Sequence, residues 1–240
     1  LWAMMRRRYE AYKDVVVRPF FNEHFLRLDR QIVLVDAMAA LNAGPRAVSD
    51  LQDALREILD CFNVGRKTFV SALFRPRADK VLFAATKADH LHHASHDRLE
   101  AILERMLERT SDRAETLGAE IDVIALAAVR ATREAQVRRN GETLPSIVGI
   151  VAAGESVAGR TFNGETEIAM FPGDLPDDPS ALLRPDAGIS STITMAHNDT
   201  DLRFLRFRPP LLEEIAAGAP ALPHIRLDRA LQFLIGDRLS

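Results

Sequence analysis

The chain has 240 residues, of which 47% are hydrophobic and 27% are charged, and its formal net charge is −3 at pH 7. This composition is ordinary for a globular protein and excludes the collagen-like, disordered and disulfide-scaffold classes. A protein that binds nucleic acid over its whole surface usually carries a strong basic excess, so the slight acidic excess argues against a nucleic-acid partner.

The first segment, residues 1–28, is predicted to be a helical lead-in that Pro19 divides into two helices, because proline lacks the N–H donor of a helix interior. Three apolar strands and two amphipathic helices then alternate. The strands are predicted at residues 31–36, 81–85 and 121–129, and the helices at about 46–62 and 92–117. This alternation is typical of a parallel sheet covered on both faces. We therefore expect residues 29–132 to form an α/β unit with a mainly parallel sheet.

The pattern changes after residue 132. Asn140-Gly141 and Asn163-Gly164 each lie between short strand-like runs, and Asn-Gly is a strong signal for a hairpin turn. We predict an antiparallel, β-rich insertion over residues 133–222, with a further strand at about 202–208. The last segment, residues 223–240, is predicted to hold a C-terminal helix that packs back on the α/β unit.

The residues directly after the second strand, Thr86-Lys87-Ala88-Asp89, have the form of the guanine-recognition motif of GTPases, Asn-Lys-x-Asp, with Thr in the first place. Ligands of open parallel sheets bind at the carboxyl ends of the strands, which is where this motif lies. The carboxylate of Asp89 can accept two parallel hydrogen bonds from guanine, and adenine lacks that pair of donors. We expect Lys87 to lie along the base and Thr86 to tie the loop to its neighbours. The alternative is a solvated Lys87 and an Asp89 that caps the next helix.

Two further strand ends complete the expected site. GTPases follow the next strand with a loop of small residues whose backbone N–H meets the guanine carbonyl, and here that loop is residues 126–129. We therefore expect Ala127, Ala128 and Val129 to contact the base. Asp36 follows the first strand, as a magnesium-binding Asp would, but no Asp-x-x-Gly pattern accompanies it. We interpret Asp36 as a capping or loop-tying residue.

Four histidines, His90, His92, His93 and His96, lie close together in the sequence. Neither a His-Glu-x-x-His motif nor a cysteine pair accompanies them, so a structural or nucleotide-flanking role is favoured over zinc, and no metal site is expected. The sequence also lacks the Gly-x-Ser-x-Gly form of a nucleophile elbow. We assign no catalytic residue.

The phosphate-binding pattern Gly-x-x-x-x-Gly-Lys-Ser/Thr is absent, and the chain begins with Leu1 rather than methionine. We therefore expect this chain to be a piece of a longer protein whose preceding part holds the phosphate cradle. The one cysteine, Cys61, cannot form an internal disulfide, which favours a reducing cytosol. No apolar run approaches the roughly 18 residues of a membrane-spanning helix.

Several stretches resemble the YcjX-like family. They are residues 30–37, 40–45, 83–93 (Phe-Ala-Ala-Thr-Lys-Ala-Asp-His-Leu-His-His), 96–99, 125–132, 171–176 and 222–230. The resemblance implies a bacterial, cytosolic, stress-linked protein of the P-loop NTPase and GTPase type, described as ATPase-like or Ras-like GTP-binding. Its Walker A segment lies in an N-terminal half, so this chain would be the C-terminal half. Family roles carry over to Lys87, Asp89 and residues 126–129.

The resemblance implies GTP or GDP as the ligand, with ATP as the alternative, and Mg²⁺ only in the presence of the N-terminal half. The complete protein would be a nucleoside triphosphatase, whereas this chain alone is not expected to hydrolyse nucleotide, because phosphate positioning supplies most of that catalysis. A second hypothesis is a regulatory protein that senses nucleotide without hydrolysis and meets a protein partner through residues 133–210.

Overall fold

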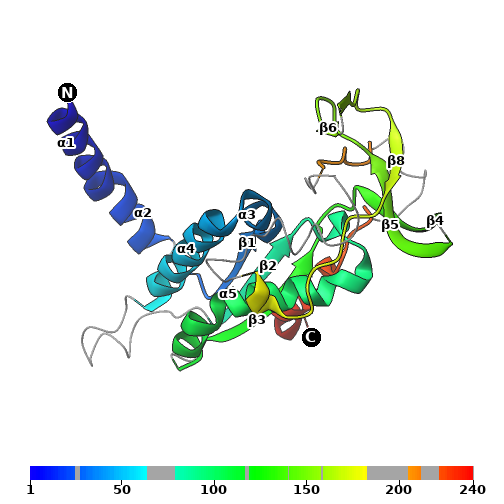
Figure 1. The fold of residues 1–240 in the computed structure, drawn as a ribbon. Helices are drawn as coiled ribbons and strands as arrows, with labels where there is room; N and C mark the ends of the chain where they lie inside the picture. Colours follow the sequence, from blue (N-terminus) through cyan, green and yellow to red (C-terminus); the bar gives the residue numbers. More distant parts are fainter. Residues whose placement is uncertain are drawn as a thin grey trace.

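The structure, a computed structural model, describes residues 1–24, 28–63, 79–116, 119–139, 141–157, 159–182, 205–211 and 222–239. It is a mixed α/β arrangement with a parallel sheet and a separate antiparallel sheet (Figure 1). The N-terminal helical segment projects away from the parallel sheet, and the antiparallel strands lie beyond the opposite end of the body. None of the helices among the described residues is long and apolar enough to cross a membrane.

The parallel sheet consists of β1 (Arg30–Val35), β2 (Lys80–Thr86) and β3 (Glu120–Leu126), in the order β1-β2-β3. Both pairs are parallel, so the predicted neighbouring strands of one parallel sheet are confirmed. β2 is central and buries five consecutive residues, which explains its continuous apolar sequence. The third strand ends at Leu126 rather than residue 129, because the backbone of Ala127 pairs with Ile225 instead.

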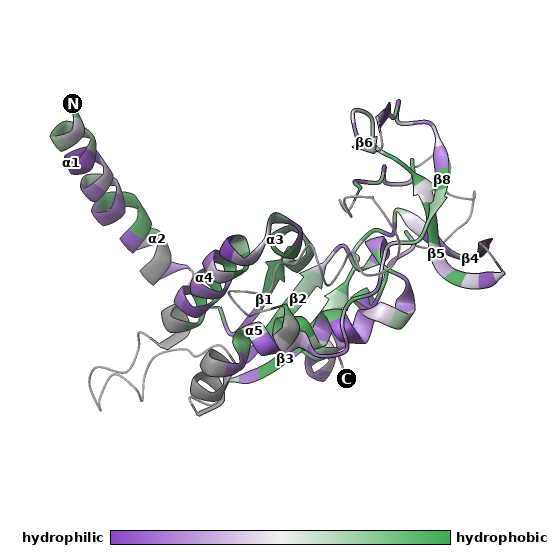
Figure 2. Cartoon of the chain, viewed as in Figure 1, coloured by the Kyte–Doolittle hydropathy of each residue, from purple (hydrophilic) through white to green (hydrophobic). Residues whose placement is uncertain are grey.

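The two faces of the sheet bury different side chains. Val81, Phe83 and Ala85 of β2 pack in a large core with α3 (Ala37–Ala43), α4 (Pro45–Asn63) and α5 (His96–Thr116). Leu82 and Ala84 face the other way and pack with Ala230 of α7 (Leu227–Ile235). The strands accordingly appear as a hydrophobic centre in Figure 2. Helices therefore cover both faces of the sheet, as the sequence predicts.

Side chains from β1 and β2 hold α7 in place. Arg30 donates to the carbonyl of Leu234 at 2.6 Å and forms a two-pronged ion pair with Asp237. The ammonium of Lys80 donates to the carbonyl of Phe233 at 3.0 Å. These bonds satisfy carbonyls at the C-terminal end of α7, where unpaired backbone acceptors concentrate.

The N-terminal segment comprises α1 (Trp2–Tyr12), the π-helical η1 (Lys13–Val17) and α2 (Arg18–Glu23). The chain does not leave the helical conformation at Pro19, which lies in the first turn of α2. The π-helical turn immediately precedes it, and the N–H of Arg18 bonds to the carbonyl of Lys13, five residues back. A π turn thus replaces the expected break.

The antiparallel sheet has the order β4-β5-β8, with β4 (Thr132–Arg139), β5 (Glu142–Ile150) and β8 (Glu167–Met170). Arg139 pairs with Glu142, and Gly141 between them has φ +85°, so the first predicted hairpin is confirmed.

The second predicted hairpin is wrong. Asn163-Gly164 does form a turn, in which Asn163 Oδ1 accepts from the N–H of Glu165 at 3.0 Å. The flanking strands do not pair with each other, because β7 (Arg160–Thr161) pairs with β6 (Ser156–Val157) and β8 pairs with β5. Of the strand expected at about 202–208, residues 202–204 lie outside the described residues, and the rest forms a single bridge, Val151 to Phe207.

Candidate functional site

The carboxyl ends of the three parallel strands lie side by side. Val35 pairs with Ala85, and Thr86 pairs with Leu126. Asp36, Lys87 and Ala127 each come directly after one of these strands, so the register brings the predicted loops 86–89 and 126–129 to one edge of the sheet. This edge is where ligands bind in open parallel sheets.

The first two loops are tied together. The hydroxyl of Thr86 donates to the carbonyl of Val35 at 3.3 Å, and Lys87 Nζ lies 2.5 Å from Asp36 Oδ2. Asp36 Oδ1 also accepts from the N–H of Ala39 at 3.1 Å as the N-cap of α3. The interpretation of Asp36 as a capping and loop-tying residue is therefore confirmed. Lys87 has a left-handed backbone, φ 63°, and its side chain is 45% exposed.

Asp89 is only 4% exposed and lies in the short 3₁₀ turn η3 (Ala88–His90). Its Oδ2 accepts from the N–H of Ala131 at 2.8 Å, and its own carbonyl accepts from the hydroxyl of Thr132. Within the described residues, no group donates a hydrogen bond to Oδ1. Asp89 thus joins the loop after β2 to the start of β4, and its carboxylate bonds there rather than at the N-terminus of the following helix.

The loop after β3 divides into two parts. Ala127 is buried, and its N–H donates to the carbonyl of Ile225 at 3.2 Å. Ala128 and Val129 are exposed, and their backbone N–H groups make no hydrogen bond to any described residue. The N–H donors that can meet a ligand here are therefore those of Ala128 and Val129, and the N–H of Ala127 is already used.

A cavity of about 170 Å³ lies beside Lys87. Its lining residues are Asp36, Met38, Ala39, Asn42, Ala43, Lys87, His90 and Arg206. It lies on the β1 side of Lys87, and residues 127–129 do not line it. Arg206 reaches it from the antiparallel part of the chain and is itself paired with Glu155 at 2.7 Å. No sequence motif identified Arg206 as part of this edge.

Two of the four histidines, His90 and His96, are buried. Burial lowers the pKa of His90, more than the nearby Asp89 carboxylate raises it, and its ring meets Phe207 edge-on at 5.4 Å. Burial also lowers the pKa of His96, whose Nε2–H donates to the carbonyl of Ala88 at 2.9 Å. His90 thus belongs to the turn that contains Asp89, and His96 at the start of α5 bonds to that turn.

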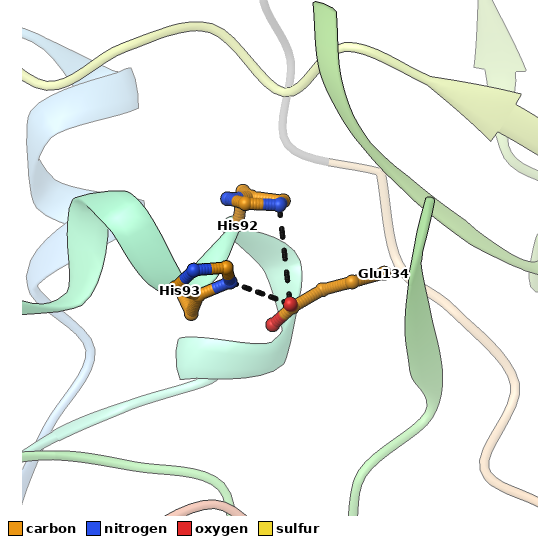
Figure 3. Close-up of side chains that lie close together, drawn as sticks. All are labelled: His92, His93 and Glu134. Atoms are coloured by element: carbon orange, nitrogen blue, oxygen red, sulfur yellow. Dashed lines mark hydrogen bonds and ion pairs between the residues drawn. The ribbon is translucent and has the colours of Figure 1, made fainter. Parts of the chain in front are cut away.

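The other two histidines meet Glu134 of β4 (Figure 3). His93 Nδ1 lies 2.6 Å from Glu134 Oε2, and His92 Nε2 lies 3.9 Å from the same oxygen. Burial raises the pKa of Glu134, but the hydrogen bond and charge of His93, with Arg130 and His92, hold it below its ordinary value. The sequence alone does not predict this contact, because Glu134 is 41 residues from His93.

The chain is similar to known proteins over nearly its whole length. The model of the YcjX-like family, DUF463, matches residues 1–239. The chain is 36% identical over 236 residues to a protein of Escherichia coli (strain K12) named Ras-like GTPase YcjX, covering 98% of this chain and 45% of that protein. It is 32% identical over 238 residues to a protein of Shewanella oneidensis (strain MR-1) with the same name, covering 99% of this chain and 44% of that protein. The chain thus spans less than half the length of these relatives, and it belongs to the YcjX-like family.

Proposed function

We propose that this chain is the base-recognising part of a bacterial guanine-nucleotide-binding protein of the P-loop type. The observation that carries the proposal is the adjacency of the Thr86–Asp89 loop and residues 127–129 at the carboxyl edge of one parallel sheet. The name of the two relatives, Ras-like GTPase, supports a guanine nucleotide over other ligands.

In this proposal each residue has a separate task. Asp89 accepts from the ring N–H and the amine of guanine through Oδ1 and the remaining lone pair of Oδ2, while the bond from Ala131 fixes its orientation. The N–H of Ala128 or Val129 meets the guanine carbonyl, and Ala127 holds that loop against Ile225. The base enters over these two exposed residues, because Asp89 itself is nearly buried.

Lys87 and Thr86 position the base plane. The stem of Lys87 lies along the base while its ammonium is held by Asp36. Thr86 fixes the spacing between the first two strands through Val35. Lys87→Ala should therefore weaken the binding of nucleotides with any base to a similar degree, because contact with the face of a base does not distinguish its edges.

Phosphate binding belongs to a further part of the longer protein in this proposal. The cavity beside Lys87, at about 170 Å³, is smaller than the roughly 300 Å³ at which typical small-molecule sites begin, so it is too small to hold a whole nucleotide. Among the described residues β1 has a single partner, β2, and its side chains Ile32 and Leu34 are 41% and 63% exposed. A further strand beside β1 would complete the sheet and cover these side chains, and the phosphate cradle with its Mg²⁺ would belong to that further part of the protein.

A protein that senses nucleotide without hydrolysis is the alternative, with residues 133–210 as the surface for a protein partner. We place the protein in the bacterial cytoplasm, which the single cysteine of this chain favours. A role in a stress response is the part of this proposal that rests on the family resemblance alone.

The test is a competition titration of the complete protein with GDP and ADP against a fluorescent guanine nucleotide. We expect GDP to bind at least about tenfold more tightly than ADP, because ADP lacks the two hydrogen-bond donors that Asp89 accepts from. A preference for ADP would instead indicate an ATP-binding protein. The 240-residue chain alone should release no phosphate from GTP, and clear release by the pure chain would show that it holds its own catalytic groups.

A further inference from the structure

The side chains of His92, His93 and Glu134 converge from two separate elements. His92 and His93 begin the turn η4 (His93–Ser95) that precedes α5, and Glu134 lies in the first half of β4. One ligand atom from each lies within 4.8 Å of the others (Figure 3). We propose that these three residues bind one Zn²⁺ ion. This site does not depend on the proposed nucleotide function.

The types of ligand and their separations fit zinc. Imidazole nitrogen and carboxylate oxygen are both zinc ligands, with bond lengths of about 2.0–2.2 Å, so neighbouring ligands of a tetrahedral ion lie about 3.4 Å apart. The distances of 2.6 and 3.9 Å from Glu134 Oε2 to His93 Nδ1 and His92 Nε2 bracket that value. Three protein ligands also leave the fourth position open to water or a further ligand, as catalytic zinc sites do.

The neighbours of the cluster favour an ion between the three side chains. Arg130 donates to Glu134 Oε1 at 3.1 Å, which leaves Oε2 turned toward both imidazoles. Hydrogen bonds to the outer atom of a ligating carboxylate are a usual feature of metal sites. The side chain of His92 is 13% exposed and that of Glu134 is 27% exposed, while His93 is 67% exposed and provides the route for entry.

Binding replaces two existing contacts. The hydrogen bond between His93 Nδ1–H and Glu134 gives way to the ion, and in a neutral ring the proton moves to Nε2 of His93. His92 Nδ1 accepts from the N–H of Ala94 at 3.3 Å, which in a neutral ring places the proton on Nε2. Coordination through Nε2 therefore moves that proton to Nδ1, which then no longer accepts from Ala94; the long bond lost is a weaker interaction than a bond to the metal.

The position of the ion gives it a structural effect. Glu134 is two residues from Thr132, whose hydroxyl bonds to the carbonyl of Asp89. An ion held by His92, His93 and Glu134 would join β4 to the segment after β2 at a second point. Zinc should therefore make the connection between the parallel sheet and the antiparallel strands more rigid.

The experiment is a calorimetric titration of the tag-free 240-residue chain, treated with chelator and dialysed, with ZnCl₂. We expect one ion per chain, and a loss of affinity of about tenfold or more in Glu134→Gln and in His93→Gln. His224→Gln is the matched control, because His224 is exposed and lies outside the cluster; its affinity should equal that of the wild type. Circular dichroism verifies that each variant folds.

Substitution of Co²⁺ into the wild type provides a readout that needs no variant. A tetrahedral site with nitrogen and oxygen ligands should give intense visible absorption that one equivalent of Zn²⁺ abolishes. The proposal is overturned if the wild type binds no stoichiometric zinc, if Glu134→Gln and His93→Gln bind it as tightly as His224→Gln does, or if the bound cobalt shows only the weak spectrum of an octahedral ion.

Discussion

Asp36 makes two contacts at the end of β1, an N-cap bond to Ala39 and an ion pair with Lys87. Asp36→Ala removes both and should lower the free energy of unfolding by about 0.5–2 kcal/mol, the usual loss on removal of a cap. Asp36→Asn keeps a capping oxygen and loses only the charge of a pair that is 45% and 35% exposed, so it should lose less, about 0–1 kcal/mol. Urea unfolding of both variants measures the difference, and equal losses would contradict the capping role.

His96 should make stability depend on pH. Burial lowers its pKa in the folded chain, so the folded state takes up the proton less readily than the unfolded state does. As the pH falls below about 6.5, the unfolded state binds more protons, and the free energy of unfolding decreases. His96→Gln should remove part of that decrease. The measurement is the urea midpoint at pH 7.5 and at pH 5.5. If the midpoint of His96→Gln decreases between these pH values as much as that of the wild type, this assignment is wrong.

At the scale of elements, Gly149 allows β5 to pack against its neighbours. A Cβ there would lie 2.7 Å from Phe207 Cδ1 and 3.1 Å from Thr132 Cγ2. Gly149→Ala should therefore lower the free energy of unfolding by about 1–3 kcal/mol through overpacking. Phe207→Leu in the same chain should recover part of the loss by making room. Equal stability of Gly149→Ala and wild type in urea unfolding would show that Phe207 moves aside freely.

The elements differ in how well the sequence predicts them. β2 is predicted well because its five consecutive apolar residues indicate a strand that is buried on both faces. α4 is predicted well because its apolar residues recur on one face of a helix. The end of β3 depends on a bridge to Ile225, almost one hundred residues further on, and the turn at Asn163-Gly164 depends on β8 pairing with β5. Such long-range pairings override the local signal, so sequence alone could not place them.

The same limit applies to the candidate site. The role of Asp36 follows from its place after a strand and before a helix, so the sequence predicts it. The bond from Ala131 to Asp89, the approach of Arg206 to Lys87 and the contact of Glu134 with two histidines all join residues far apart in the chain. No local spacing encodes these contacts, and the contact of His92 and His93 with Glu134 in particular depends on β4 lying beside η4.

At the scale of the whole molecule, the N-terminal elements α1 and η1 contribute no side chain to a buried core. Their side chains are almost all exposed. The ribbon of this segment projects away from the parallel sheet (Figure 1). Deletion of residues 1–17 should therefore leave the urea midpoint of the remaining chain unchanged, because no core contact is lost. Circular dichroism during urea unfolding measures it. A clear decrease in the midpoint would mean that this helix packs on the body.

The most direct test of the proposed function is Asp89→Asn in the complete protein. The amide can still accept from Ala131, so the fold should be kept, but its NH₂ group faces the donors of guanine. Titration with GDP, XDP and ADP should show GDP affinity reduced about 10- to 150-fold, the loss of one hydrogen bond to a charged group. XDP, which carries an oxo group in place of the amine, should bind the variant comparatively better. Unchanged GDP affinity in folded Asp89→Asn would contradict the account and leave Asp89 as a structural tie between β2 and β4.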